Sequence, residues 1–314
     1  MQDRRIQMKK IRFLWILPVL ACLLLSGCAD ANIPADAANP SVKESLAVPI
    51  TTQVESSSAE SSALEQSSAD AKESASVQEG SEPIGLKRFL KTALLPLGET
   101  AYIWGGGWNE EDTGAGTEAR TLGVSPRWKE FSKDLPANYN HKKYRYQIHD
   151  GLDCSGFVGW AIYNTLETEN GMEGYVYKST DVATTLASLG LGEFTPAKSV
   201  TDWKPGDIAS MSGHVWICLG TCEDGSVLVL HSSPPGVRLC GIAASSKATA
   251  AIQLAAEYME RYYPDWYSRF PDCESPKTYL QKSSQMRWNE ETFPDAKEIQ
   301  SMTPQALLQL LYAE

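Results

Sequence analysis

One cysteine and two histidines are the residues whose types and order could carry chemistry. Cys154 follows Asp153, and His214 and His231 come downstream. A cysteine thiolate attacks an amide carbonyl to form a thioester, while a histidine takes up the thiol proton and returns it to the departing amine. A third polar side chain commonly orients that histidine. The chain has only 4 histidines, so few residues compete for these roles.

Motifs for several other reaction types are absent from the sequence. It contains no G-x-S-x-G elbow, no H-E-x-x-H zinc helix and no phosphate-binding P-loop. The remaining cysteines lack convincing partners for a zinc site. We therefore predict chemistry that uses no metal and no cofactor.

Short motifs surround these residues in a fixed order over about 135 residues. With them, the chain resembles the NlpC family of papain-like cell-wall cysteine peptidases. Five blocks carry the resemblance: Tyr102-x-Trp104-Gly105-Gly106, Asp153-Cys154-Ser155-Gly156-Phe157-Val158, Pro205-Gly206-Asp207-Ile208, Gly213-His214-Val215-x-Ile217-x-Leu219-Gly220, and His231 ahead of Gly236-Val237.

The resemblance implies a role for each matched residue. Cys154 corresponds to the nucleophile, His214 to the general base and acid, and His231 to the residue that orients His214. The hydroxyl of Tyr102 corresponds to an oxyanion-hole donor that acts beside the backbone N–H of Cys154. Two further matched positions line the substrate cleft, Asp153 and Ser155.

The reaction that the resemblance implies is hydrolysis of peptidoglycan stem peptides at the bond between D-γ-glutamate and a diamino acid. The partners would be peptidoglycan peptides, and we expect a monomer. Nothing in the residues themselves identifies this bond. An amidase or acyltransferase on the same fold is an alternative, because a Cys/His pair also supports acyl transfer to other acceptors. A noncatalytic wall-binding lipoprotein is a third reading.

A helix and two strands must position these side chains. Asp153 is a good N-cap for a helix with Phe157, Trp160 and Ala161 on one face, so Cys154 would lie at a helix N-terminus that favours a thiolate. Residues 208–211, 214–219 and 226–232 read as strands. Further helices are expected at 181–189, from Ser245/Ser246 up to Pro264, and after Thr303-Pro304.

The predicted fold class is α+β. By the resemblance it is papain-like: the helix that starts at Cys154 packs against an antiparallel sheet that carries both histidines. We place the peptidase domain at 86–245, followed by a helical C-terminal extension, 246–314, packed on the domain.

Strand spacing yields a further prediction about the histidines. If 214–219 and 226–232 form a hairpin, a six-residue loop at Gly220–Gly225 sets His214 opposite His231. A tight Asp224-Gly225 turn offsets the two by four residues, or about 13 Å. We predict the wide loop, unless a bulge corrects the register.

An insertion at 107–151 separates the first motif from Cys154, where the family usually has a short loop. It holds several aromatic residues, among them Trp108 and Trp128. Two interpretations stay open: the segment shapes the cleft or contacts glycan, or its aromatic side chains only pack it onto the domain.

The N-terminal residues predict export and lipid attachment. A basic stretch precedes the apolar run Phe13–Leu25, which is shorter than the roughly 20 residues that a membrane-spanning helix needs. Leu25-Ser26-Gly27-Cys28 looks like a lipoprotein processing box, so residues 1–27 would be the signal peptide and Cys28 the lipidated residue. Residues 28–85, rich in Ser, Ala and Glu, would form a disordered linker. We expect an extracytoplasmic protein anchored to the membrane of the cell envelope.

The net charge bears on the possible partners of the mature protein, and the cysteines bear on its disulfide state. Removing residues 1–27 takes away five basic residues and one acidic residue, which changes the net charge from −11 to −15. An acidic body argues against nonspecific binding to nucleic acid or to an anionic surface. The disulfide state of the other cysteines stays open: Cys218, Cys222, Cys240 and Cys273.

Overall fold

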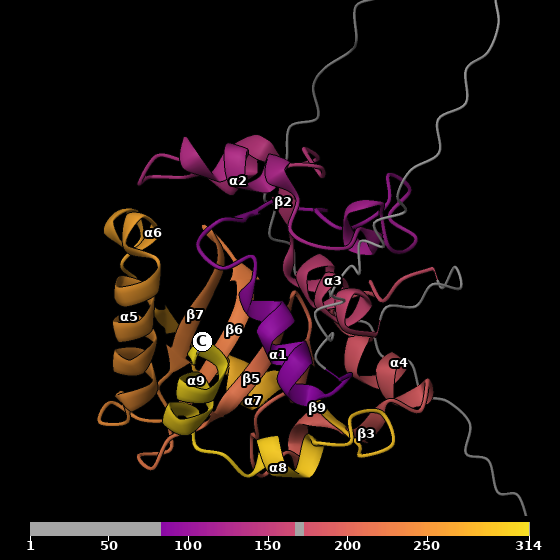
Figure 1. Cartoon of the computed structure of the whole chain (residues 1–314), viewed down its shortest axis with the longest axis vertical. Coiled ribbons are helices and arrows are strands. Elements are labelled where there is room, and N and C mark those ends of the chain that lie inside the picture. The colour runs from indigo at the N-terminus through magenta and orange to yellow at the C-terminus, as the bar shows by residue number, and fades with distance from the viewer. Residues whose placement is uncertain (1–82, 167–172, 314) are drawn as a thin grey trace, which may run out of the picture. The chain divides into compact units, whose positions relative to one another are not determined.

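A mixed, mostly antiparallel sheet with helices on both faces forms the part of the chain that the computed structural model describes, residues 83–166 and 173–313 (Figure 1). The α+β class is therefore as predicted. The predicted signal peptide at 1–27, Cys28 and nearly all of the predicted linker at 28–85 lie outside the described residues. Within the described ranges, every helix is too short or too polar to span a bilayer.

The sheet orders its strands β2-β1-β7-β6-β5-β4-β9-β3, and β8 adds to it by pairing with β7. The pairs β1–β2 and β7–β8 are parallel, and all the others are antiparallel. The strands are β1 (Ala101–Tyr102), β2 (Gly151–Leu152), β3 (Gly192–Thr195), β4 (Ile208–Met211), β5 (His214–Thr221), β6 (Val227–Ser233), β7 (Gly236–Ile242), β8 (Glu274–Ser275) and β9 (Ser284–Trp288).

The helices lie before, between and after these strands. The α-helices are α1 (Leu86–Leu94), α2 (Pro126–Lys133), α3 (Cys154–Leu166), α4 (Val182–Ser188), α5 (Ala250–Tyr262), α6 (Pro264–Arg269), α7 (Thr278–Lys282), α8 (Ala296–Gln300) and α9 (Pro304–Tyr312). Three short 3-10 helices are η1 (Glu118–Arg120), η2 (His141–Tyr144) and η3 (Ala197–Ser199).

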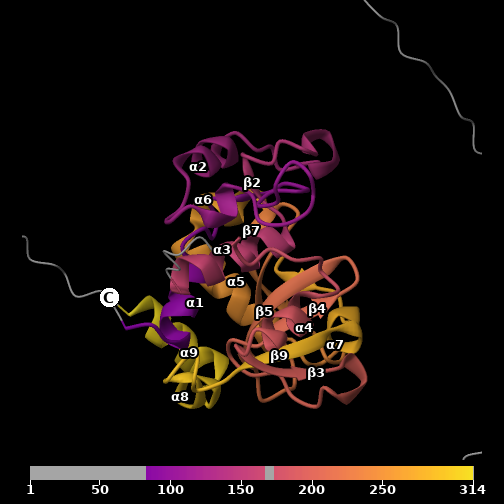
Figure 2. The same cartoon turned by 90° about the vertical axis from the view of Figure 1, so that its right-hand side faces the viewer.

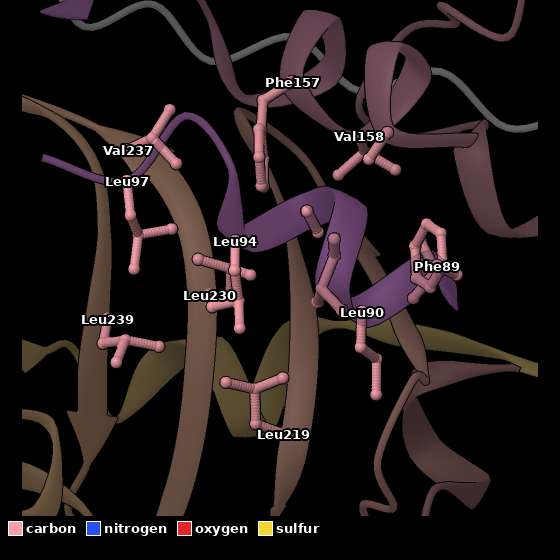
Figure 3. Close-up of a cluster of buried hydrophobic side chains, with 14 of the residues drawn as sticks. Phe89, Leu90, Leu94, Leu97, Phe157, Val158, Leu219, Leu230, Val237 and Leu239 are labelled. Carbon is pink, nitrogen blue, oxygen red and sulfur yellow. The ribbon is translucent and has the colours of Figure 1, made fainter. Parts of the chain in front are cut away.

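The larger core lies between one face of the sheet and helices α1, α3, α5 and α9. Figure 3 shows α1 and α3 directing side chains toward the strands, with Phe89 and Leu90 on α1 and Phe157 on α3. Leu219 and Leu230 meet them from β5 and β6. These side chains are fully buried, and each such burial contributes about 1.5–3 kcal/mol. This packing holds the first turn of α3 against the sheet.

A smaller core covers the opposite face of the sheet. Trp203, Trp216 and Cys218 belong to it, together with residues of β6 and β7, and α7 packs on it. Figure 2 shows α7 on the other side of the central strands from α1. His214 and His231 share this face, because they alternate with Val215 and Leu230 of the larger core.

The expected elements in the middle of the chain are confirmed. Helices occur at 154–166 and 182–188, and strands at 208–211, 214–221 and 227–233. The N-cap predicted at Thr303 is confirmed as well, since its side chain accepts a hydrogen bond from the backbone N–H of Ala306. Pro264 ends α5, as expected, and also starts α6.

The C-terminal extension differs from the prediction of a helical segment. Besides its helices it supplies β8 and β9, and β9 inserts between β4 and β3 within the sheet. Asp295 from the same extension accepts hydrogen bonds from the first N–H groups of α1, 3.0 Å to that of Lys87. The extension is therefore part of the fold rather than an appendage on a finished domain. Strand β9 was missed because its short run of residues, Ser284–Trp288, mixes polar and apolar side chains.

Candidate active site

Cys154 is the first residue of α3, directly after the residue that caps the helix. The Asp153 carboxylate accepts hydrogen bonds from the N–H of Gly156 (2.7 Å) and the hydroxyl of Ser155 (3.0 Å). The predicted N-cap is thus confirmed. The Cys154 side chain is mostly buried but borders a cavity of about 260 Å³.

The two motifs at Gly105–Gly106 and Cys154–Gly156 touch each other directly. The backbone N–H of Asp153 donates to the carbonyl of Gly106 at 2.9 Å. A Cβ atom on Gly156 would overlap that same carbonyl, and one on Gly106 would overlap the backbone of Gly151. Only glycine permits this close approach, which sets the loop against the first turn of α3.

Trp108, from the start of the insertion, reaches the same site. Its indole N–H donates to the Ser155 hydroxyl at 3.0 Å, and that hydroxyl donates to Asp153. Trp108 and Asp112 also line the cavity beside Cys154. The two interpretations of the insertion therefore apply to different parts of it, since Trp128 is buried and packs edge-on against Trp160.

His214 and His231 form a direct hydrogen bond, with 2.9 Å between His214 Nε2 and His231 Nδ1. Both side chains are almost fully buried. With Nε2 engaged, Nδ1 is the His214 ring nitrogen left to exchange a proton with a thiol. That assignment makes His231 Nδ1 an acceptor and puts its proton on Nε2, which is buried without a partner.

The six-residue loop predicted between β5 and β6 does not occur, whereas the bulge named as its alternative does. Thr221 pairs with Val227, and the N–H of Cys222 donates to the carbonyl of Ser226, so the turn is only residues 223–225. A bulge at Leu219 then shifts the register by one, and Ile217 pairs with Leu230. His214 is consequently two residues, about 6.6 Å, from the position opposite His231. The two imidazole rings are long enough to span this diagonal distance and form the hydrogen bond.

The residues on either side of His214 lie close to the cysteine site. Gly213, the preceding residue, lines the same cavity as Cys154. The backbone N–H of Val215, the following residue, is directed at the Cys154 sulfur and lowers the pKa of the thiol. The chain on both sides of His214 therefore borders the nucleophile.

Tyr102 closes another side of the site. It lines the cavity, and its ring lies edge-on to that of His141 at 5.6 Å. Burial, followed by the nearby Cys154 and Asp153 charges, raises the pKa of the Tyr102 hydroxyl. The hydroxyl thus stays protonated and is able to donate a hydrogen bond, as an oxyanion-hole residue must.

Tyr279 on α7 is a site residue that the sequence analysis missed. Its ring lies over the His214 ring with 4.7 Å between centroids, and 6.3 Å from that of His231. Burial raises the pKa of Tyr279, and charge at Cys154 raises it further. The residue lies outside every matched motif, and a tyrosine in a polar five-residue helix carries no sequence signal for such a contact.

Burial determines the protonation state of the nucleophile and its base. It raises the pKa of the Cys154 thiol to about 12, with a further contribution from Asp153, and lowers the pKa of His214 to about 4. Both shifts favour a neutral thiol and a neutral imidazole in the resting pair. Burial thus opposes the thiolate that the N–H groups at the helix N-terminus favour.

His231 is kept neutral as well. Burial lowers its pKa well below the ordinary value, and the nearby His214 and Arg238 add to this. Arg238 lies directly opposite His231 in the β6–β7 pair. A neutral His231 is able to accept a hydrogen bond from His214 while His214 carries a positive charge.

The other cysteines of the described part are free thiols, including Cys218, Cys222, Cys240 and Cys273. Cys218 is fully buried, as expected for a residue on the His214 face of the sheet. Among residues 83–166 and 173–313, no cluster of three His, Cys, Asp or Glu side chains is arranged to hold a metal ion.

No protein-family model matches the chain, and neither a curated protein nor a solved structure matches it at a significant level.

Proposed function

We propose that the chain is a cysteine peptidase that hydrolyses the stem peptides of peptidoglycan. The observation that carries this proposal is the 2.9 Å hydrogen bond between His214 and His231 at the strand end beside Cys154. An oriented imidazole, a nucleophile at a capped helix N-terminus and a neighbouring phenol are the parts that acyl transfer needs. The substrate class comes from the resemblance of the five motifs to the NlpC family.

The neutral resting pair favours attack assisted by a general base. As the Cys154 sulfur bonds to the amide carbon, its proton passes to Nδ1 of His214. The backbone N–H of Cys154 and the Tyr102 hydroxyl stabilise the oxyanion, which is worth roughly 3–4 kcal/mol per donor at such sites. His214 then gives the proton to the departing amine, and the thioester forms.

Hydrolysis of the thioester returns the enzyme to its starting state. His214, neutral again, takes a proton from water as the water oxygen attacks the acyl carbon. The bond to sulfur breaks, the acid product leaves, and the proton returns to Cys154. His231 accepts a hydrogen bond from His214 Nε2 throughout and so keeps the ring in one orientation.

Incubation of the full chain, held in mild detergent, with defined stem peptides and muropeptides tests the proposal, with products identified by mass spectrometry. Cys154→Ala should lower kcat/KM by at least about 10⁴-fold. Cys222→Ala is the matched control, because Cys222 is also a free thiol but does not line the cavity. Equal cleavage by the Cys154→Ala variant would refute the nucleophile assignment. Binding without cleavage by the unsubstituted chain would favour a noncatalytic wall-binding protein.

The location proposed for the enzyme is the outer side of the membrane, with a lipid anchor at Cys28. What supports it is the processing box that ends at Cys28, together with the apolar run before it. Fractionation of cells that express the Cys28→Ala variant tests it. The variant should be absent from the membrane fraction, and an unchanged distribution would contradict lipid attachment at Cys28.

A further inference from the structure

The cavity beside Cys154 is lined by charged side chains of both signs. Lys178 is the one lysine or arginine among its described lining residues, which also include the carboxyl groups of Asp112 and Asp153. The Asp153 carboxylate is already engaged by hydrogen bonds from Ser155 and Gly156. Lys178 is exposed, and no ion pair links it to an acidic side chain in the described part of the chain. Its ammonium group is thus available to a ligand in the cavity that holds the nucleophile.

The backbone around Lys178 is held firmly to the histidine strand. The Ser179 hydroxyl accepts a hydrogen bond from the N–H of Gly213 at 3.0 Å, and the Ser179 carbonyl accepts one from the Ser210 hydroxyl. The carbonyl of Lys178 accepts from the N–H groups of Asp181 and Val182, at 2.7 and 3.2 Å. The backbone of Lys178 is therefore fixed next to the turn that precedes His214.

We infer that Lys178 binds a free carboxylate of the substrate, close to the amide that Cys154 attacks. This inference rests on the proposed peptidase function and specifies its substrate class. In a γ-linked glutamyl residue the α-carboxylate remains free, four bonds from the scissile carbonyl carbon. An ammonium group in the nucleophile's own cavity is suited to that carboxylate and distinguishes it from the uncharged carboxamide.

The contribution of this contact should lie between that of a surface ion pair and that of a buried charged hydrogen bond. Lys178 is exposed in the free protein, and a peptide in the cavity would remove part of its water. We expect about a tenfold preference in kcat/KM for the carboxylate over the carboxamide. The preference should shrink as the salt concentration rises, because salt screens exposed charges.

Two peptides and four proteins make the test. The peptides are L-Ala–γ-D-Glu–L-Lys and its counterpart with the glutamyl α-carboxylate converted to the carboxamide. The full chain should prefer the first by about tenfold, Lys178→Met should cleave both within about twofold, and Lys178→Arg should restore the preference. Lys198→Met is the control, because Lys198 is exposed in η3 and does not line the cavity. It should retain the tenfold preference.

The outcomes separate this inference from the proposed function. Equal cleavage of both peptides by the full chain, or a preference that survives in Lys178→Met, overturns the role of Lys178 and leaves the peptidase standing. If neither peptide is cleaved, the proposed function fails instead. Calorimetric binding of both peptides to the Cys154→Ala variant, with and without Lys178→Met, then decides the carboxylate site on its own: equal affinities overturn it.

Discussion

The two halves of the candidate site are built in different ways. The cysteine half, Gly106–Gly107 and the first turn of α3, is held by backbone contacts so close that a Cβ atom would not fit. The histidine half, at the ends of β5 and β6, is held by strand register and by the ring of Tyr279. Close backbone contacts require glycine at particular positions, so they produce a motif that can be recognised in the sequence. The contact of the Tyr279 ring with the His214 ring has no such motif in the sequence.

Substitution of the histidines should produce the largest effects and separate the two roles within the histidine half. His214→Ala removes the proton acceptor and donor, so kcat/KM should fall by about 10⁴-fold. His231→Ala removes only the orienting acceptor, and a loss of about 10²-fold is expected. His231→Asn, which offers an amide oxygen as acceptor, should recover part of it.

Steady-state kinetics on a defined stem peptide, with circular dichroism as a check on folding, makes this measurement. A His231→Ala enzyme as active as the unsubstituted chain would mean that the imidazole pair has no part in catalysis.

Gly156→Ala tests the close packing of the cysteine half. The new methyl group would overlap the carbonyl of Gly106. Overpacking costs about 1–3 kcal/mol, and alanine recovers up to about 1 kcal/mol as a better helix former. We expect a net loss of about 1–2 kcal/mol in the free energy of unfolding, measured with urea. Gly114→Ala is the control, because nothing lies within 4 Å of its Cβ position. Similar stabilities for the two variants would show that the contact is not close.

Tyr279→Leu tests whether the ring cover sets the protonation of the histidine half. The base must be neutral to accept the thiol proton, and burial lowers the pKa of His214 to about 4. Removing the ring admits water, so the pKa should rise toward the ordinary 6.5, and the fraction of active base at pH 5 to 6 should fall. Tyr279→Phe keeps the ring and should keep the low pKa. NMR titration of the His214 ring measures the pKa directly, and identical values in Tyr279→Leu and the unsubstituted chain would contradict this role.

The comparison of the two halves also marks the limit of prediction from the sequence. The N-cap at Asp153, the helix after it and the strands around His214 and His231 were predictable, because caps and period-two patterns act within a few residues. Of the two alternatives for the β5–β6 connection, the wide loop does not occur and the bulge does. The bulge at Leu219 and the short turn at 223–225 change the register together, and neither has a residue pattern that excludes the wider loop.

The sequence by itself determined which residues are available for chemistry: Cys154 behind its cap, two histidines in order, and glycines where the backbones meet. Tertiary structure alone decided that His214 and His231 meet on a diagonal and that Tyr279 covers them. It also decided that Lys178 and Trp108 share a cavity with the nucleophile and that burial raises the pKa of the thiol. Local hydrogen bonds select residue types over short spacings, whereas burial and electrostatics depend on segments that are distant in the chain and meet only in the folded structure.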